Sequence, residues 1–599
     1  MKILLVAINA KYIHSNLAVY SLKAYAEKYA CDFKNNENKI EIAEYTINQY
    51  PDWILRDIYL KKPDVIGFSC YIWNISMVEE IVENIYKVLP RVHVWFGGPE
   101  VSYTAQDFLN KHNHAKGVIC GEGEEIFKNV LEAYSDEEST DILLQNIKGI
   151  SFWNNGKIIS NEPEKPIDMS KIPFVYENLS DFENRIIYYE SSRGCPFSCS
   201  YCLSSIDKQL RFRDIELVKK ELKFFIDNRT AQVKFVDRTF NCKREHAMEI
   251  WRFIRDNDNG VTNFHFEIAA DIMTDEEIAL IKTMRPGLIQ LEIGVQTTNP
   301  TTIQLIDRKM DFAKVSQVVE KLKESDNVHL HLDLIAGLPE EDVLSFENSF
   351  NMVYELKPEQ LQLGFLKVLH GSKIEEQIRS NEMEFLSRPP YEVLSTKWIS
   401  YGDVLRLKRV EEVLEIYYNS GQFAASIAEL EKYFDTPFEM YDKLGEFYER
   451  YGINGEKHSR LQRYEILLDF YKEVIGTEAD RKFRIFCQLL TFDLYLRDNI
   501  KNRPDFASSR EAYKKTITSI YIREEKDRKI LPDYVRYSSK QLAKMTHIEV
   551  FDFNLEMYLK KGIDKRQDYY ILFDYCNRNP LNNGAKVIQV DDRKIDEES

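Results

Sequence analysis

The first 131 residues alternate between apolar, β-branched runs and amphipathic stretches. Buried strands are predicted at residues 2–8, 40–47, 64–72, 93–98 and 117–120, and helices at 17–29, 76–89 and 124–134. Strands that alternate with helices in this way are typical of a doubly wound parallel sheet. A hairpin is predicted at 149–160, where Asn155-Gly156 supplies the turn, and a proline-bearing stretch follows to residue 174.

A second alternating series occupies the middle of the chain. Its strands are predicted at 186–192, 233–237, 264–270, 288–294, 329–337 and 361–369, and its helices at 216–228, 244–256, 275–284, 312–325 and 341–356. Six strands with helices between them predict an open, partial (β/α)6 barrel. After Ser372 the strand pattern stops and helical spacing takes over, except for two apolar runs near 547–576 that predict a small sheet.

These patterns predict an α/β protein built from four segments. We expect a doubly wound domain at 1–140, a hairpin and linker at 141–180, a partial barrel at 181–372, and a mostly helical segment at 373–599. No chemistry follows from the pattern of the last segment.

Composition and charge exclude several classes of protein. The 599 residues are 44% hydrophobic and 30% charged, which is typical of a globular chain and excludes disorder throughout. The formal net charge of −17 repels phosphate backbones and anionic lipid everywhere except at a locally basic patch. No apolar run approaches the ~20 residues of a membrane span, and no cleavage site follows the first apolar run. We therefore expect a cytoplasmic protein without a membrane span.

Three of the nine cysteines crowd into eight positions just after a predicted strand. Cys195, Cys199 and Cys202 have the spacing C-x3-C-x2-C, and a short loop of this kind can hold an iron-sulfur cube with one iron left open. Zinc is the alternative, but it usually takes four ligands, and no cysteine or histidine follows within the next thirty or so residues.

This loop resembles that of the radical S-adenosylmethionine (SAM) superfamily. Cys195, Cys199, Tyr201 and Cys202 match the family pattern C-x3-C-x-aromatic-C position by position, and the resemblance covers about residues 185–370. It implies a 4Fe-4S cluster whose open iron binds SAM. It also implies an electron donor such as flavodoxin or ferredoxin, whose electron cleaves SAM to a 5′-deoxyadenosyl radical.

Further SAM contacts are expected at the ends of barrel strands, where the family commonly places polar groups. Asp237 ends the second strand, Glu267 lies in the third, and Gln296 follows the fourth. Each could equally be a helix cap or a carboxylate that supports a ligand from behind.

The order of a doubly wound domain, a hairpin and a three-cysteine barrel resembles the cobalamin-binding subclass of these enzymes. Glycine-rich loops at strand ends allow a backbone to approach a flat macrocycle closely. The resemblance places the following residues around cobalamin: Asn9, Ser69, Tyr71, Gly97, Gly98, Glu100, Gly121, Glu122 and Gly123. The D-x-H-x-x-G motif that supplies an axial histidine elsewhere is absent, so we expect no protein histidine on the lower face of cobalt, with His14 as the only nearby alternative.

The resemblance implies a cobalamin-dependent enzyme, and methylation of an unactivated carbon is the first hypothesis. Radical cyclisation or rearrangement remains open. A methylthiotransferase would need a second cluster on Cys31, Cys70 and Cys120. A further alternative is a non-enzymatic cobalamin or redox sensor, which would not turn over SAM.

The substrate is not predicted by any motif. Chains of this arrangement carry a C-terminal domain of unknown function, so the resemblance to the family does not imply a substrate. Residues 501–544 hold 12 basic against 6 acidic residues, with Tyr513, Tyr521, Tyr534 and Tyr537 interleaved. Such a patch can bind RNA, or it can be a solvated helix surface. Because the whole chain is acidic, we favour a small molecule over RNA.

Overall fold

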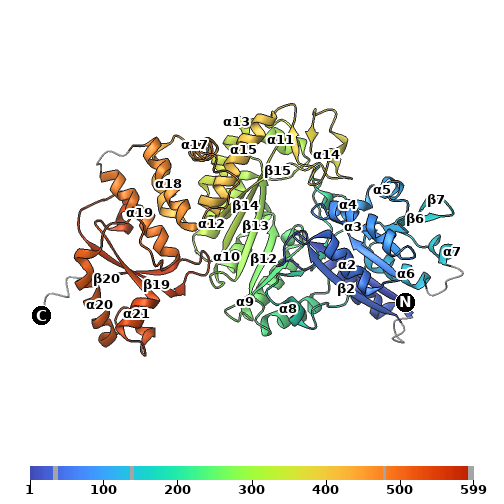
Figure 1. Cartoon of the computed structure of the whole chain (residues 1–599), viewed down its shortest axis with the longest axis horizontal. Coiled ribbons are helices and arrows are strands. Elements are labelled where there is room, and N and C mark those ends of the chain that lie inside the picture. Colours follow the sequence, from blue (N-terminus) through green and yellow to red (C-terminus); the bar gives the residue numbers. More distant parts are fainter. Residues whose placement is uncertain (32–37, 135–139, 477–480, 591–599) are drawn as a thin grey trace. The chain divides into compact units, whose positions relative to one another are not determined.

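The computed structural model describes residues 1–31, 38–134, 140–476 and 481–590. The chain divides into two compact units (Figure 1). One comprises Met1–Phe346 and Gly364–Tyr401, and the other comprises Glu347–Leu363 and Gly402–Ser599. None of the helices in the described ranges has the length and apolar character needed to cross a membrane.

A seven-stranded sheet in the order β2-β1-β3-β4-β5-β6-β7 forms the N-terminal part of the first unit. The strands are β1 Lys2–Asn9, β2 Lys39–Thr46, β3 Val65–Ser69, β4 His93–Gly97, β5 Gly117–Ile119, β6 Ile150–Asn154 and β7 Lys157–Ser160. The first five are parallel, as predicted. The predicted hairpin forms, but it joins the edge of this sheet as two antiparallel strands instead of belonging with the linker.

Side chains of β1 alternate between two hydrophobic cores, because successive residues of a strand point to opposite faces. Leu4, Val6 and Ile8 enter one core, and Ile3, Leu5 and Ala7 enter the other. Helices α2 and α3 pack on the first face, and α1 and α6 on the second. The helices of this part are α1 Leu17–Tyr29, α2 Pro51–Lys61, α3 Ile75–Val88, α4 Pro99–Ser102, α5 Ala105–Lys111, α6 Gly123–Ala133 and α7 Thr140–Leu144.

The barrel is an open sheet of six strands in the order β15-β14-β13-β12-β11-β8, which is the predicted partial barrel (Figure 1). The strands are β8 Ile187–Tyr189, β11 Gln232–Phe235, β12 Asn263–Ile268, β13 Ile289–Gln296, β14 His329–Ala336 and β15 Gln360–Phe365. The helices are α8 Ile215–Asp227, α9 Arg244–Asp256, α10 Asp275–Lys282, α11 Pro300–Leu305, α12 Phe312–Lys323 and α13 Val343–Glu355. Along β13, buried apolar residues alternate with half-buried polar ones, so one face packs on helices and the other is polar.

Two predictions for the C-terminal part need correction. Two short strands, β16 Glu384–Phe385 and β17 Val393–Ser395, follow Ser372, where no strand was expected, and α14 Lys373–Glu376 precedes them. The predicted small sheet forms from β18 Thr546–Phe551 and β19 Tyr569–Arg578, but a third strand, β20 Ala585–Val590, completes it. The rest is helical, as predicted: α15 Tyr401–Leu414, α16 Ala424–Leu430, α17 Pro437–Arg450, α18 Arg460–Val474, α19 Arg481–Arg497, α20 Lys514–Asp527, α21 Ser539–Met545 and α22 Leu555–Lys561.

Candidate cofactor site

The three-cysteine loop is closed at its base by a two-stranded antiparallel ladder. Strand β9 Ser192–Arg193 precedes the loop and β10 Arg211–Phe212 follows it, with Arg211 opposite Arg193. Gly194 has a φ of 89°, and a Cβ there would lie 2.6 Å from the carbonyl oxygen of Gln209. The Cys195 amide donates to the Asp207 carbonyl at 3.1 Å. The backbone of the loop is therefore held in place by its own hydrogen bonds and by a position that favours glycine.

All three thiols of the loop are free, and their surroundings suit a cluster. Cys195 is 8% exposed and Cys199 is 6% exposed, while Cys202 is half-buried. The Cys195 sulfur has weak polar neighbours in the Thr239 hydroxyl, at 3.6 Å, and the Phe197 backbone. Burial raises the pKa of the Cys195 thiol, so a bound cation is needed to hold it as a thiolate. Three free thiols at this spacing in one short loop fit an iron-sulfur cluster.

Arg308, which sequence reasoning missed, connects this loop to the barrel. Its Nη1 lies 3.6 Å from the Cys199 sulfur and donates to the Tyr201 hydroxyl at 3.1 Å. Its Nη2 donates to the Gly294 carbonyl in β13. More than a hundred residues separate Arg308 from the loop in sequence, so only the fold brings them together.

The Asp237 carboxylate is already fully engaged by the segment before the loop. It accepts from the Ser191 amide at 3.0 Å and from the hydroxyls of Ser191 and Ser192 at 2.7 and 2.5 Å. Burial raises the pKa of Asp237, which is only 1% exposed. This geometry favours the alternative for Asp237, namely support of β9 from behind, although a SAM contact remains a prediction.

The environments of Glu267 and Gln296 differ from that of Asp237. Burial raises the pKa of Glu267 to about 7, against the opposing charge of Arg238. Gln296 has a φ of 73° at an irregularity of β13, and its buried Oε1 has no hydrogen-bond partner. An orphaned amide oxygen and a carboxyl group that is easily neutralised suit a polar ligand at the end of the strands.

A charged cluster lies on the polar face of the barrel. Glu292, His331 and Asp333 have ligand atoms within 4.8 Å of one another. Glu292 already accepts from His265 at 2.8 Å and from Lys234 at 3.2 Å. Burial alone would raise the pKa of Glu292, but the hydrogen bond from His265 and the charges of Lys234 and His331 lower it to about 2. Because the Lys234 ammonium already neutralises this carboxylate, we assign no metal to the cluster.

The predicted cobalamin residues share one edge of the first sheet. The carboxyl ends of β1, β3, β4 and β5 are neighbours in the strand order, which brings Asn9, the 69–71 turn, the 97–100 turn and the 121–123 turn together. The Asn9 side chain donates to Glu44 and to the His14 carbonyl, and the Ser69 hydroxyl accepts from Asn16 at 2.9 Å.

Glycines keep this edge open and let its loops pack closely. Gly98 has a φ of 114°, and a Cβ there would lie 2.4 Å from the Cys70 carbonyl oxygen. A Cβ on Gly97 would only touch Ile119 at 3.7 Å, and one on Gly123 would lie 2.8 Å from Leu22. Gly121 has a φ of 93° and nothing within 4 Å of a Cβ, so the backbone there faces open space.

An aromatic pair follows β3 at the same edge. The rings of Tyr71 and Trp73 are stacked 4.4 Å apart at 6°. Trp73 is 44% exposed, although its indole donates to the Ile8 carbonyl at 3.1 Å. Burial raises the pKa of Tyr71 to about 12, with Arg238 opposing. Sequence reasoning included Tyr71 but missed Trp73, two positions further along the same turn.

His14 and Glu100 are engaged by other side chains. The His14 Nδ1 lies 2.6 Å from the Tyr188 hydroxyl, and burial lowers the pKa of the imidazole. Glu100 accepts from the Tyr391 hydroxyl at 2.5 Å, and burial raises its pKa.

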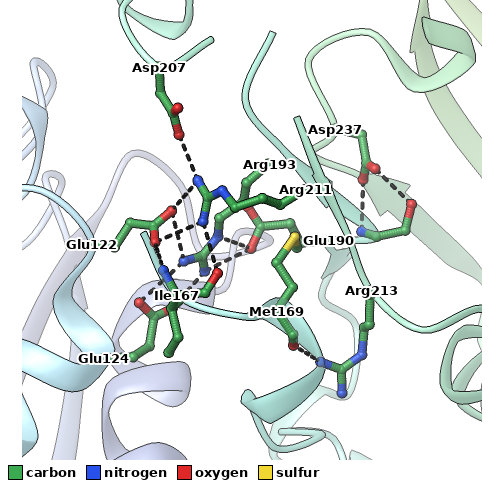
Figure 2. A network of polar contacts seen from close by, with 11 residues as sticks. Glu122, Glu124, Ile167, Met169, Glu190, Arg193, Asp207, Arg211, Arg213 and Asp237 are labelled. Carbon is green, nitrogen blue, oxygen red and sulfur yellow. Dashed lines mark hydrogen bonds and ion pairs between the residues drawn. The ribbon is translucent and has the colours of Figure 1, made fainter. Parts of the chain in front are cut away.

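Glu122, which caps α6, and Glu124, the second residue of that helix, pair with the base of the cysteine loop. Figure 2 shows Glu122 with Arg211 and Glu124 with Arg193. The Glu122 carboxylate is thereby committed to Arg211 and to the Ile167 amide. Glu122 therefore has partners within the protein, and its contact with cobalamin stays a prediction.

The second cluster of a methylthiotransferase finds no common place in this fold. Cys70 and Cys120 follow β3 and β5 at the carboxyl edge, whereas Cys31 follows α1 at the amino edge, before β2. A strand of eight residues such as β1 separates the two edges, which is about 25 Å. Three thiols so placed cannot bind one cluster.

The tyrosines of the basic segment 501–544 are largely used within the second unit. Tyr513 donates to Asp568 at 2.9 Å, Tyr534 contacts Asp574, and Tyr521 lies 3.1 Å from Thr546. Tyr537 is 38% exposed. Tyr521 is 7% exposed and Tyr534 is 4% exposed. Because stacking platforms for bases need free ring faces, this burial favours the solvated-surface interpretation.

Family models match three regions of the chain. A B12-binding domain model matches residues 3–131, a radical SAM superfamily model matches residues 189–353, and a model of a protein family of unknown function (DUF4080) matches residues 380–573.

The curated relatives are distant. A 2-(S-pantetheinyl)-carbapenam-3-carboxylate methyltransferase of Streptantibioticus cattleyicolor is 24% identical over 49% of this chain and 45% of its own length. An anaerobic magnesium-protoporphyrin IX monomethyl ester cyclase of Cereibacter sphaeroides is 23% identical over 50% of each chain. The chain therefore spans about half the length of these relatives.

A solved structure shares the fold over most of the chain. The cobalamin-dependent SAM radical enzyme OxsB with aqua-cobalamin bound has a TM-score of 0.57 at 14% identity, covering 82% of this chain and 80% of OxsB. The predicted fold class and cofactors are thus confirmed: the matched domains are those that hold a 4Fe-4S cluster with SAM, and cobalamin.

Proposed function

Because the chain belongs to the cobalamin-dependent radical SAM enzymes and carries a C-terminal domain of unknown function, we propose that it methylates an unactivated carbon of a small molecule. The proposal rests on the observation that both proposed cofactor sites lie in one compact unit. The three-thiol loop and the glycine-lined edge of the first sheet both belong to Met1–Phe346. A methyl donor and a radical generator within one unit are what this reaction requires.

In this proposal Cys195, Cys199 and Cys202 hold the cluster, and Tyr201 with Arg308 fixes the loop against β13. Glu267 and Gln296 bind the polar groups of SAM, since the Gln296 Oε1 lacks a partner. When bound, the cluster and SAM supply a carbon-centred radical oxidant, and cobalamin supplies a methyl group. The protein orients these groups and excludes water.

Cobalamin is proposed to lie on the open side of Gly121, against the exposed face of Trp73. An aromatic face is a suitable surface for a macrocycle. Neither residue is a histidine, and the ring of His14, the histidine that follows β1, is engaged by Tyr188. We therefore propose that no protein nitrogen ligates cobalt.

A second candidate reaction is radical cyclisation, which is favoured by the match to a relative named as a cyclase. Both reactions share the proposed sites and differ in whether a methyl group appears in the product. In either case we place the protein in the cytoplasm, where flavodoxin or ferredoxin can donate the electron.

Anaerobic reconstitution of the full chain tests the proposal. We expect one 4Fe-4S cluster, 5′-deoxyadenosine formation from SAM, and a cob(II)alamin electron paramagnetic resonance spectrum without protein nitrogen hyperfine splitting. The triple variant C195A/C199A/C202A should lose the cluster absorption and deoxyadenosine formation together. Retention of a full cluster in that variant, or nitrogen splitting that disappears in H14A, would refute the assignment. Absence of deoxyadenosine from the cluster-loaded wild type would favour a sensor.

A further inference from the structure

The base of the cysteine loop carries two arginines side by side on one ladder. Arg193 in β9 and Arg211 in β10 are direct cross-strand partners. Like charges at opposed positions destabilise a strand pair. The position is therefore stable only if carboxylates approach both guanidinium groups.

Two of those carboxylates come from the B12-binding domain. Glu124 approaches Arg193 with both oxygens, at 2.6 and 3.3 Å, and Glu122 approaches Arg211 with both oxygens, at 2.7 and 2.9 Å (Figure 2). These fork-shaped contacts are geometrically specific. Glu190 and Asp207, from the segments around the loop, complete the set at 2.9 and 2.6 Å. Glu124 is only 4% exposed, so its pairing is not a loose surface contact.

The same short turn carries the glycine that faces open space. Glu122 directly follows Gly121, and Glu124 is the second residue of α6. A displacement of this turn by a cofactor at Gly121 therefore moves the carboxylates that hold the cysteine loop. The converse also holds, because an ordered cysteine loop fixes the turn.

We propose that Glu122, Glu124, Arg193 and Arg211, here called the clasp, are positioning residues that couple cobalamin binding to the state of the iron-sulfur loop. This inference rests on the proposed function for its two cofactors. Coupling between binding sites is reciprocal, so each cofactor strengthens binding of the other. A reaction that uses two cofactors needs their relative positions to be controlled, because a misplacement of about 1 Å can lower the rate roughly 100-fold.

The test is a thermodynamic cycle with hydroxocobalamin as the probe. Its dissociation constant is measured in full-length protein with the cluster and in the cluster-free C195A/C199A/C202A protein. We expect binding at least ~5-fold weaker without the cluster, the lower end of typical coupling. In the E122Q/E124Q background this ratio should fall to about one.

The matched control is E125Q. Glu125 lies in the same first turn of α6, but its partners Lys128 and Tyr25 belong to its own domain, at 3.1 and 2.5 Å. We expect E125Q to keep the wild-type ratio, and R211K, which keeps the charge but loses the fork, to have an intermediate one. A purely structural clasp would lower the melting temperature and leave the ratio unchanged, and that result would overturn the proposal.

Hydrogen exchange of residues 194–212, measured without cobalamin, helps to distinguish failure of the clasp from failure of the proposed function. Faster exchange there in E122Q/E124Q but not in E125Q, together with the fall of the cobalamin ratio, supports the clasp. Absence of cobalamin binding by the wild type would refute the proposed function, whereas wild-type binding with a ratio that E122Q/E124Q leaves unchanged would overturn the clasp alone. Unchanged exchange overturns the clasp whatever cobalamin does. The single variants E122Q and E124Q serve if the double variant does not fold.

Discussion

Replacing Arg308 by glutamine should lower the reduction potential of the cluster. The guanidinium is a positive charge 3.6 Å from the Cys199 sulfur, and it stabilises the electron that reduction adds. At an effective dielectric constant of about 20, two unit charges at 3.6 Å interact by about 5 kcal/mol. The added electron spreads over irons and sulfurs, so roughly a quarter of this acts, about 1 kcal/mol or ~50 mV for a one-electron couple.

The assay is an anaerobic redox titration followed by electron paramagnetic resonance, without SAM. Lys309→Gln is the matched control, because it removes an exposed charge one residue away and should leave the potential nearly unchanged. Cluster content from visible absorption must be equal in the variants that are compared. A potential for Arg308→Gln that equals the wild-type value, or lies above it, would refute the reasoning.

Three further predictions concern other parts of the chain. Trp73→Ala should weaken hydroxocobalamin binding about threefold to tenfold, and Trp73→Phe should restore most of it, because the stacking surface is retained; equal affinity in all three proteins would remove Trp73 from the site. Glu267 has a folded pKa of about 7, raised from 4.5, so its contribution to stability is full below about pH 4 and is lost as the pH rises through 7. Glu267→Gln should therefore raise the melting temperature relative to wild type at pH 8 more than at pH 5, and an equal effect at both values would contradict this. Reversal of Lys514 and Lys515 to glutamate should leave the weak binding of bulk tRNA unchanged, and a steep salt dependence that this reversal abolishes would favour RNA as a partner.

Local patterns were sufficient to predict the two sheets. The alternation of Leu4, Val6 and Ile8 with Ile3, Leu5 and Ala7 is written in consecutive residues, and it gave the buried two-faced strand correctly. The cysteine spacing likewise predicts its chemistry without any tertiary information. Such features can be predicted from local sequence because they depend only on the period of a strand or on the reach of one loop.

Contacts between distant segments were not predictable in the same way. Nothing near Arg308 in sequence points to Cys199, and nothing around Glu122 points to Arg211, since both pairings arise only when the barrel and the first sheet have formed. Gly121, Glu122 and Gly123 were therefore assigned one role, around the corrin, whereas the structure also gives the Glu122 carboxylate a partner in Arg211. Strand β20 was missed because its sequence, AKVIQV, has only a short apolar pattern and is stabilised by pairing with β19.

The joint between the first sheet and the barrel limits how this protein can be recombined. A boundary drawn in the linker after β7 keeps the seven-stranded sheet intact, but an exchanged B12-binding domain takes Glu122 and Glu124 with it and leaves Arg193 and Arg211 behind. Two partly buried guanidinium groups would then face each other with fewer carboxylates, and loss of one partner of a buried ion pair is costly. The exchangeable module is therefore the domain together with the two-stranded base of the cysteine loop, although these segments lie about seventy residues apart in the chain.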